Sequence, residues 1–155
     1  MSNLLTTSSV RPSWDDYFLE IVGAVAGRAT CDRGRCGSII VADRQILATG
    51  YVGSPPGFPH CDDVGHDMID GHCVRTVHAE QNAFVSAARR GVSVASATLY
   101  TTLAPCRVCA MLAVTAGVQR VVAASAYQNG HGLAVLEFAG IEYRVVDPRI
   151  TYVTR

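Results

Sequence analysis

Two short segments of the chain carry residue types that bind metal ions. They are His78-Ala79-Glu80 and Pro105-Cys106-Arg107-Val108-Cys109, and each opens a stretch with helical character. Cysteines at positions i and i+3 project to the same side of a first helical turn, where free backbone N–H groups and the positive dipole end favour thiolate over thiol. Two thiolates and one imidazole leave the fourth tetrahedral position for water, which is the pattern of catalytic zinc. We therefore predict that His78, Cys106 and Cys109 hold a zinc ion.

The carboxylate of Glu80 lies two residues after this histidine. It can lie beside the metal without ligating it, and it is then free to carry protons. Water bound to zinc ionises near neutral pH, so an adjacent carboxylate suits general acid/base catalysis. We predict that Glu80 is the catalytic proton carrier.

The chain has six cysteines and five histidines, and we expect it to be cytoplasmic because its first residues lack a secretory leader. Thiols stay reduced in that compartment, so metal binding explains the cysteines better than disulfides do. Thirteen basic and thirteen acidic residues give a net charge of zero, which disfavours a polynucleotide substrate. No apolar run is long enough to span a bilayer, so we expect no membrane association.

Hydrophobic periodicity, with glycine after each helix, predicts an α/β domain. The predicted helices are Ser13–Arg28, Ala79–Arg90, Arg107–Ala116 and Leu133–Ala139; the predicted strands are Ser38–Val41, Gln45–Val52, Ala97–Thr102, Arg120–Ser125 and Ile141–Val146. The first two strands form a hairpin through Ala42-Asp43-Arg44, and the later alternation indicates parallel crossovers. We expect a three-layer α/β/α domain with one mixed sheet of about five strands, a single domain over residues 1–155 with 1–12 flexible. Residues 53–76 are predicted to be an irregular functional loop.

His-x-Glu followed by Pro-Cys-x-x-Cys is the signature of zinc nucleobase deaminases. The flanking segments resemble deoxycytidylate (dCMP) deaminases, including bacterial members of the competence-operon type, within the cytidine/deoxycytidylate deaminase superfamily. The segments that carry this resemblance are Arg11–Phe18, Ile46–Tyr51, Cys73–Ala83, Ala97–Thr102 and Gly117–Val122. It implies that zinc-activated water attacks C4 of a cytosine ring while Glu80 passes protons to N3 and to the departing amine.

The resemblance also implies a second, structural zinc. Its ligands would be Cys31, Cys61, His66 and Cys73, although a cysteine is expected at position 66. Imidazole keeps the capacity to ligate, and His72 is an alternative to His66. Such a site would hold the irregular loop in place. Cys36 belongs to neither set.

Substrate contacts are predicted at five positions. In relatives an asparagine occupies the position of Val52 and contacts the sugar. Valine cannot form that hydrogen bond, so the identity of the substrate is left open. The resemblance places the backbone of Ala104 and Pro105 near the leaving amine. Tyr127 follows a strand at its carboxyl end and either stacks on the base or is a rim aromatic, and Asn82 either orients substrate or caps local backbone.

The predicted function is hydrolytic deamination of a free pyrimidine nucleotide, with dCMP as the best candidate. A modified pyrimidine nucleotide or a guanine-like or pterin-like heterocycle is the enzymatic alternative, and a nucleotide-sensing zinc protein is the non-enzymatic one. The unligated carboxylate of Glu80 argues against the last. Relatives commonly form hexamers, so we expect a homo-oligomer, with the alanine-rich 79–88 helix as a candidate contact.

Overall fold

The computed structural model describes residues 10–127 and 130–151, so most of the segment expected to be flexible, residues 1–12, lies outside the described residues. The helices are α1 (Trp14–Ala26), α2 (Cys61–Val64), α3 (Ala79–Arg89), α4 (Arg107–Thr115) and α5 (His131–Phe138). The strands are β1 (Gly37–Ala42), β2 (Gln45–Tyr51), β3 (Met68–Ile69), β4 (His72–Cys73), β5 (Thr98–Leu103), β6 (Arg120–Ala126) and β7 (Glu142–Thr151). No helix in this described part is long and apolar enough to cross a membrane.

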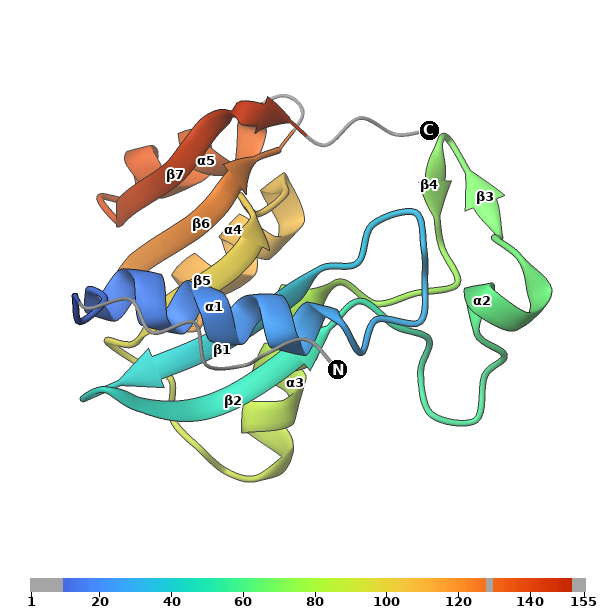
Figure 1. Cartoon of the computed structure of the whole chain (residues 1–155), viewed down its shortest axis with the longest axis horizontal. Helices are drawn as coiled ribbons and strands as arrows, with labels where there is room; N and C mark the ends of the chain where they lie inside the picture. The colour runs from blue at the N-terminus through green and yellow to red at the C-terminus, as the bar shows by residue number, and fades with distance from the viewer. Residues whose placement is uncertain (1–9, 128–129, 152–155) are drawn as a thin grey trace.

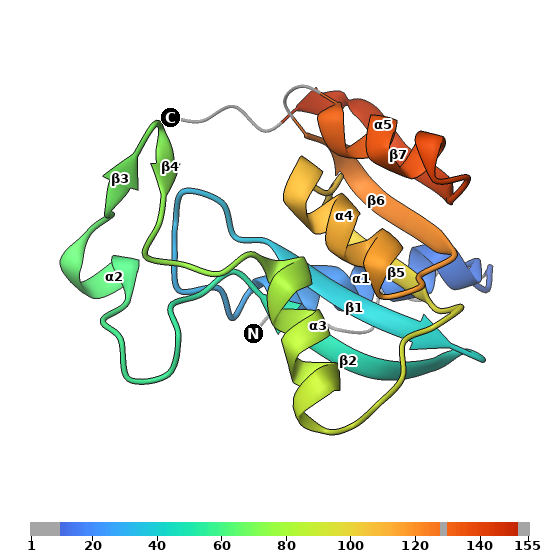
Figure 2. The ribbon, with the colours of Figure 1, turned by 180° about the vertical axis from the view of Figure 1, so that it is seen from behind.

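Five strands form one mixed sheet in the order β2-β1-β5-β6-β7. The β1 strand pairs antiparallel with β2 and β5, whereas β5, β6 and β7 run parallel. Helix α1 covers one face of the sheet, and α3, α4 and α5 cover the other (Figure 1 and Figure 2). The predicted three-layer α/β/α architecture is therefore confirmed.

Adjacent residues of the central strands feed two separate cores, because successive side chains of a strand point to opposite faces. Ile39, Tyr100 and Val122 pack against Phe18 and Val22 of α1. Their neighbours pack under the three helices on the other face, in a core that includes Ile40, Leu99, Val121, Ala83, Ala110 and Leu136. Burial on both faces explains why these strands read as continuous apolar runs.

The hairpin is tighter than predicted. Ala42 belongs to β1, so only Asp43 and Arg44 form the turn, with φ of 49° and 62°. Two consecutive left-handed residues produce the twist that suits a two-residue hairpin, and aspartate tolerates that conformation better than most residues.

The predicted irregular loop contains short regular elements. Helix α2 and the paired strands β3 and β4 lie within it, to one side of the main sheet (Figure 1). Elements of four and two residues are too short to produce a recognisable period, which is why the sequence pattern missed them.

Both helices that carry the metal-binding motifs begin where the motifs predicted. His78 is the N-cap of α3, and its backbone N–H donates to Oε1 of Gln81 at 3.1 Å. Cys106 is the N-cap of α4, and its sulfur accepts from the backbone N–H of Cys109 at 3.5 Å. The two helix starts are neighbours because both helices lie on the same face of the sheet.

Candidate active site

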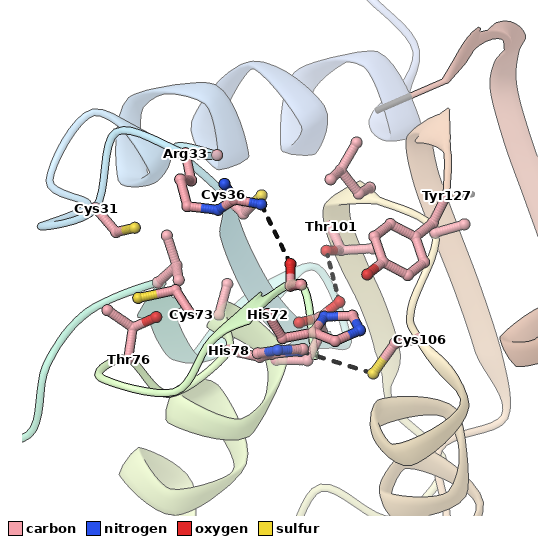
Figure 3. A pocket seen from close by; sticks show the side chains of 17 residues that line it. Cys31, Arg33, Cys36, His72, Cys73, Thr76, His78, Thr101, Cys106 and Tyr127 are labelled. Carbon is pink, nitrogen blue, oxygen red and sulfur yellow. Dashed lines mark hydrogen bonds between the residues drawn. The ribbon is translucent and has the colours of Figure 1, made fainter. Parts of the chain in front are cut away.

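A pocket opens at the edge of the sheet where β5 and β6 end and β1 begins (Figure 3). This is the carboxyl end of the parallel strands, where ligands usually bind in α/β sheets. Its wall is formed by Cys31, Arg33, Gly34, Cys36, Val52, Gly71, His72, Cys73, Thr76, His78, Ala79, Glu80, Thr101, Leu103, Ala104, Cys106 and Tyr127. The segments that supply them are far apart in sequence.

The first metal-binding group lies in this pocket. Nδ1 of His78 is 3.7 Å from Sγ of Cys106 and 3.5 Å from Sγ of Cys109. Ligands of a tetrahedral zinc with ordinary Zn–S and Zn–N bonds lie about 3.5–3.8 Å apart, so these three atoms fit a zinc ion. The group of ligand atoms that lie within 4.8 Å of one another contains only these three members among the described residues. The donor set therefore has the open position of a catalytic site.

The two sulfurs of this group share protons unequally. The pKa of Cys106 falls to about 4 because it accepts hydrogen bonds from the Cys109 thiol and from His78. The pKa of Cys109 is raised because its thiol donates to Cys106 and is buried. A thiolate already stabilised by neighbouring hydrogen-bond donors is a good starting point for binding a cation.

Glu80 lies in the same pocket and is almost entirely buried, with 7% of its surface exposed. Burial raises the pKa of its carboxyl group. Oγ1 of Thr101 is 3.5 Å from Oε1 of Glu80, and the hydroxyl of Ser38 donates to Oγ1 of Thr101 at 2.9 Å. A buried carboxyl group with a raised pKa, held in place by strand residues, is suited to exchanging protons near neutral pH.

The second group consists of Cys31, Cys61, His66 and Cys73, whose ligand atoms also lie within 4.8 Å of one another. Sγ of Cys61 is 3.5 Å from Sγ of Cys73, and Sγ of Cys31 is 3.6 Å from Nδ1 of His66. Nε2 of His66 faces Oδ1 of Asp32 at 3.2 Å, an arrangement that orients the imidazole of a metal ligand. Four donors at this spacing fit a closed, structural zinc site.

Of the two candidate histidines, His66 is therefore the one in the second group. His72 instead lines the pocket next to it, in the strand that ends with Cys73. Strand β4 explains the difference, because neighbouring residues of a strand project to opposite sides.

The positions predicted to contact substrate separate into two sets. Val52, Ala104 and Tyr127 line the pocket, whereas Pro105 and Asn82 are not part of its wall. Pro105 is fully buried, and the side-chain amide of Asn82 donates to the backbone oxygen of Tyr51 at 2.8 Å. That bond ties α3 to the end of β2, which matches the local backbone role considered for Asn82.

Arg33, Cys36 and Thr101 are among the pocket residues that sequence reasoning missed. Burial raises the pKa of Cys36 to about 12, so it remains a neutral thiol. Strand alternation could have found Thr101, because Leu99 and Thr101 are separated by one residue of β5. No local pattern marks Arg33 and Cys36, which come from the irregular segment before β1.

Residues 12–125 match the family model of the cytidine and deoxycytidylate deaminase zinc-binding region. The matched segment is most of the chain and contains every member of both metal-binding groups. This chain belongs to the cytidine and deoxycytidylate deaminase family.

Comparison with individual proteins supports this family assignment. The chain is 38% identical over 138 residues to ComE operon protein 2 of Bacillus subtilis, covering 88% of this chain and 73% of that protein. It is 39% identical over 124 residues to the deoxycytidylate deaminase of Mycobacterium phage D29, covering 72% and 94%. Among solved structures it resembles the dCMP deaminase of cyanophage S-TIM5 in complex with dCMP and dUMP, with a TM-score of 0.78, 29% identity, and 88% and 98% coverage.

Proposed function

We propose that this chain hydrolyses the exocyclic amine of a free pyrimidine nucleotide, converting dCMP to dUMP and ammonia. The observation that carries the proposal is the three-donor group of His78, Cys106 and Cys109 with the buried carboxyl group of Glu80 in the same pocket. The names of the phage relatives support dCMP as the substrate.

The roles follow from the chemistry of each group. His78, Cys106 and Cys109 would hold the catalytic zinc, and the chemistry it would supply is a water molecule activated for attack at near-neutral pH. Glu80 takes a proton from that water and delivers it to N3 of the cytosine ring. It then takes the second proton of the same oxygen, which is now bonded to C4, and passes it to the departing amine, so that the C4 carbonyl forms and ammonia leaves. Thr101 holds the carboxyl group in place from β5 at 3.5 Å. Ala104 lies at the end of this strand, where its backbone can face the leaving amine.

Cys31, Cys61, His66 and Cys73 would hold the structural zinc. The segment that they connect has little other means of staying folded. Its helix has four residues, its two strands have two each, and most of its side chains between residues 62 and 72 are exposed. Because the unfolded chain has no preformed site, the free energy of metal binding would stabilise the folded state of this segment.

The sugar side of the pocket departs from the family pattern. Val52, directly after β2, presents an apolar side chain where a hydrogen-bonding one is expected. An amino-heterocycle other than cytosine, or a modified pyrimidine nucleotide, is therefore the alternative substrate class. Tyr127 also lines the pocket (Figure 3) and is placed to stack on a planar base.

The experiment is an ammonia-release assay of zinc-replete protein with dCMP, CMP, 5-methyl-dCMP, cytidine and cytosine. We expect dCMP to have the highest kcat/KM. If none of these compounds is turned over, the pyrimidine assignment is wrong, and guanine-like and pterin-like heterocycles become the next substrates to assay.

Glu80→Gln tests the mechanism. It should retain zinc and fold while kcat falls by at least about 10²–10⁴, the usual contribution of a general acid/base. Glu20→Gln on the exposed side of α1 is the matched control and should match wild type. Substantial turnover by Glu80→Gln would remove this residue from the proton pathway.

We also propose a cytoplasmic homo-oligomer. All six cysteines are free of disulfides, which suits a reducing compartment. The alanine-rich side of α3 does not provide the contact, because Ala79, Ala83 and Ala87 are buried against the sheet of their own chain. The exposed apolar residues Met111 and Phe138 of α4 and α5 are better candidates. Analytical ultracentrifugation measures the subunit number.

A further inference from the structure

Three polar side chains are buried together at the base of the reaction centre. Among the described residues, the buried polar or charged side chains are those of Ser38, Thr101 and Glu80, with 0%, 1% and 7% of their surfaces exposed. Burying a hydroxyl group costs free energy unless it finds a hydrogen-bond partner, and alanine or valine would fill a similar space without that cost. Packing alone therefore does not explain the two hydroxyl groups.

The two hydroxyl residues are a cross-strand pair. Ser38 of β1 lies directly opposite Thr101 of β5 in the antiparallel register. Ile40 and Leu99 are the next pair on the same face, and they pack in the core under α3, α4 and α5. Both hydroxyls are therefore on the side of the sheet that faces α3, whose first turn carries Glu80. Thr101 also lines the pocket (Figure 3).

The hydrogen bonds of this pair run in one direction. The hydroxyl of Ser38 donates to Oγ1 of Thr101 at 2.9 Å, so the proton of Thr101 does not point back to Ser38. Two acceptors are within its reach: Oε1 of Glu80 at 3.5 Å and the backbone oxygen of Gly37 at 3.4 Å. Thr102 already donates to that backbone oxygen at 3.0 Å. A carboxylate is also the stronger acceptor, so the proton of Thr101 is directed to Glu80.

We propose that Ser38 and Thr101 are positioning residues for the proton carrier: Ser38 fixes the direction of the Thr101 hydroxyl, which holds Oε1 of Glu80 against β5 and leaves Oε2 to carry protons. The inference rests on the proposed function and deepens it, because it assigns separate tasks to the two carboxylate oxygens. Catalytic hydrogen bonds are often long without substrate and shorten in the complex, which fits the distance of 3.5 Å. A carboxylate with one oxygen held in place is already oriented when the ring binds.

Thr101→Val removes the hydroxyl and keeps the shape of the side chain. We expect kcat for dCMP to fall about 10-fold with KM nearly unchanged, because the lost hydrogen bond acts on Glu80 and not on the bound substrate. Thr101→Ser keeps the hydroxyl and should retain most of the activity, and Ser38→Ala should lower kcat less than Thr101→Val does. Thr98→Val makes the same change in β5 outside the wall of this pocket, and it should match wild type.

A double variant that combines Ser38→Ala with Thr101→Val separates positioning from packing. In Thr101→Val alone, the buried hydroxyl of Ser38 loses its acceptor, which lowers the midpoint of thermal unfolding. Removing both hydroxyls eliminates the unpaired group, so the double variant should regain most of the lost thermal stability. Its kcat should stay as low as that of Thr101→Val, since Ser38 acts only through Thr101.

A crystal structure of zinc-loaded Thr101→Val gives a readout that does not need turnover. The carboxylate of Glu80 should leave its wild-type position in this variant and keep it in Thr101→Ser. Calorimetry with dUMP should give the same affinity for wild type and both variants, because neither change touches the bound nucleotide.

Three results would overturn the inference. The first is recovery of kcat together with thermal stability in the double variant, because the pair would then serve folding alone. The second is a higher KM and weaker dUMP binding in Thr101→Val with unchanged kcat, because Thr101 would then contact the substrate itself. The third is an unchanged position of Glu80 in the crystal structure of Thr101→Val. Failure of the proposed function is a separate result: no cytosine compound reacts with wild type, whereas the crystal structures still report whether Thr101 holds Glu80.

Discussion

The close approach of β2 to α3 predicts a severe effect of Gly50→Ala. A Cβ atom at Gly50 would lie 2.2 Å from the backbone oxygen of Ala79 and 2.3 Å from the backbone nitrogen of Ala83. Ordinary contacts of a Cβ begin at 3.4 Å, so β2 and α3 must separate by about 1.2 Å. Both obstructing atoms are backbone, and no side chain can rotate away.

This displacement of α3 would move residues of the predicted reaction centre. Ala79 lies between His78 and Glu80 at the start of α3, whereas Cys106 and Cys109 belong to α4. Moving α3 by about 1 Å therefore separates one predicted metal ligand and the predicted proton carrier from the other two predicted ligands. Misplacement of this size lowers catalysis by about 10²-fold. Overpacking also lowers the free energy of unfolding by about 1–3 kcal/mol.

The assays are kcat/KM for dCMP, zinc content, and the midpoint of thermal unfolding, which shifts by about 2–4 °C per kcal/mol in a domain of this size. Gly23→Ala is the control: Gly23 is an exposed residue of α1 with no atom within 4 Å of a Cβ. It should retain activity and gain roughly 0.4–1 kcal/mol. Wild-type kcat/KM in Gly50→Ala would refute the argument that this contact sets the position of His78 and Glu80.

Two further predictions concern the rest of the molecule. Asp15 accepts from Arg120 at 2.7 and 2.9 Å, and this guanidinium holds the pKa of the carboxyl group well below its usual value of 3.8. The ion pair therefore contributes fully to the free energy of unfolding above about pH 4, and this contribution is lost as pH falls further. Asp15→Asn should lower the free energy of unfolding by about 1.5–3 kcal/mol at pH 7, and by less at pH 3, as measured by urea unfolding. Cys61→Ala should lower the zinc content from two ions to one per chain and speed hydrogen exchange over residues 61–73; an unchanged zinc content would exclude the second site.

Much of the reaction centre was visible in the sequence because its geometry is local. The i, i+3 spacing of Cys106 and Cys109 places both sulfurs on one turn of α4, and His78 and Glu80 share the start of α3. Glycine at the helix ends and β-branched runs indicated the alternation of strands and helices. The exact hairpin and the short elements around Cys61 and Cys73 were missed, because two or four residues are too few to establish a period.

The sequence by itself therefore predicted the family, the three-layer fold, the first donor set, the cysteines of the second donor set and Glu80 as the proton carrier, from residue types in short motifs and from the family resemblance that they carry. Only the tertiary structure decided which histidine joins the second group, that Asn82 bonds to the end of β2, and that Arg33 faces the pocket beside His72. These relations join residues 38 and 31 positions apart, or project adjacent side chains to opposite sides of one short strand. They depend on how the chain returns on itself, and spacing along the chain does not report that.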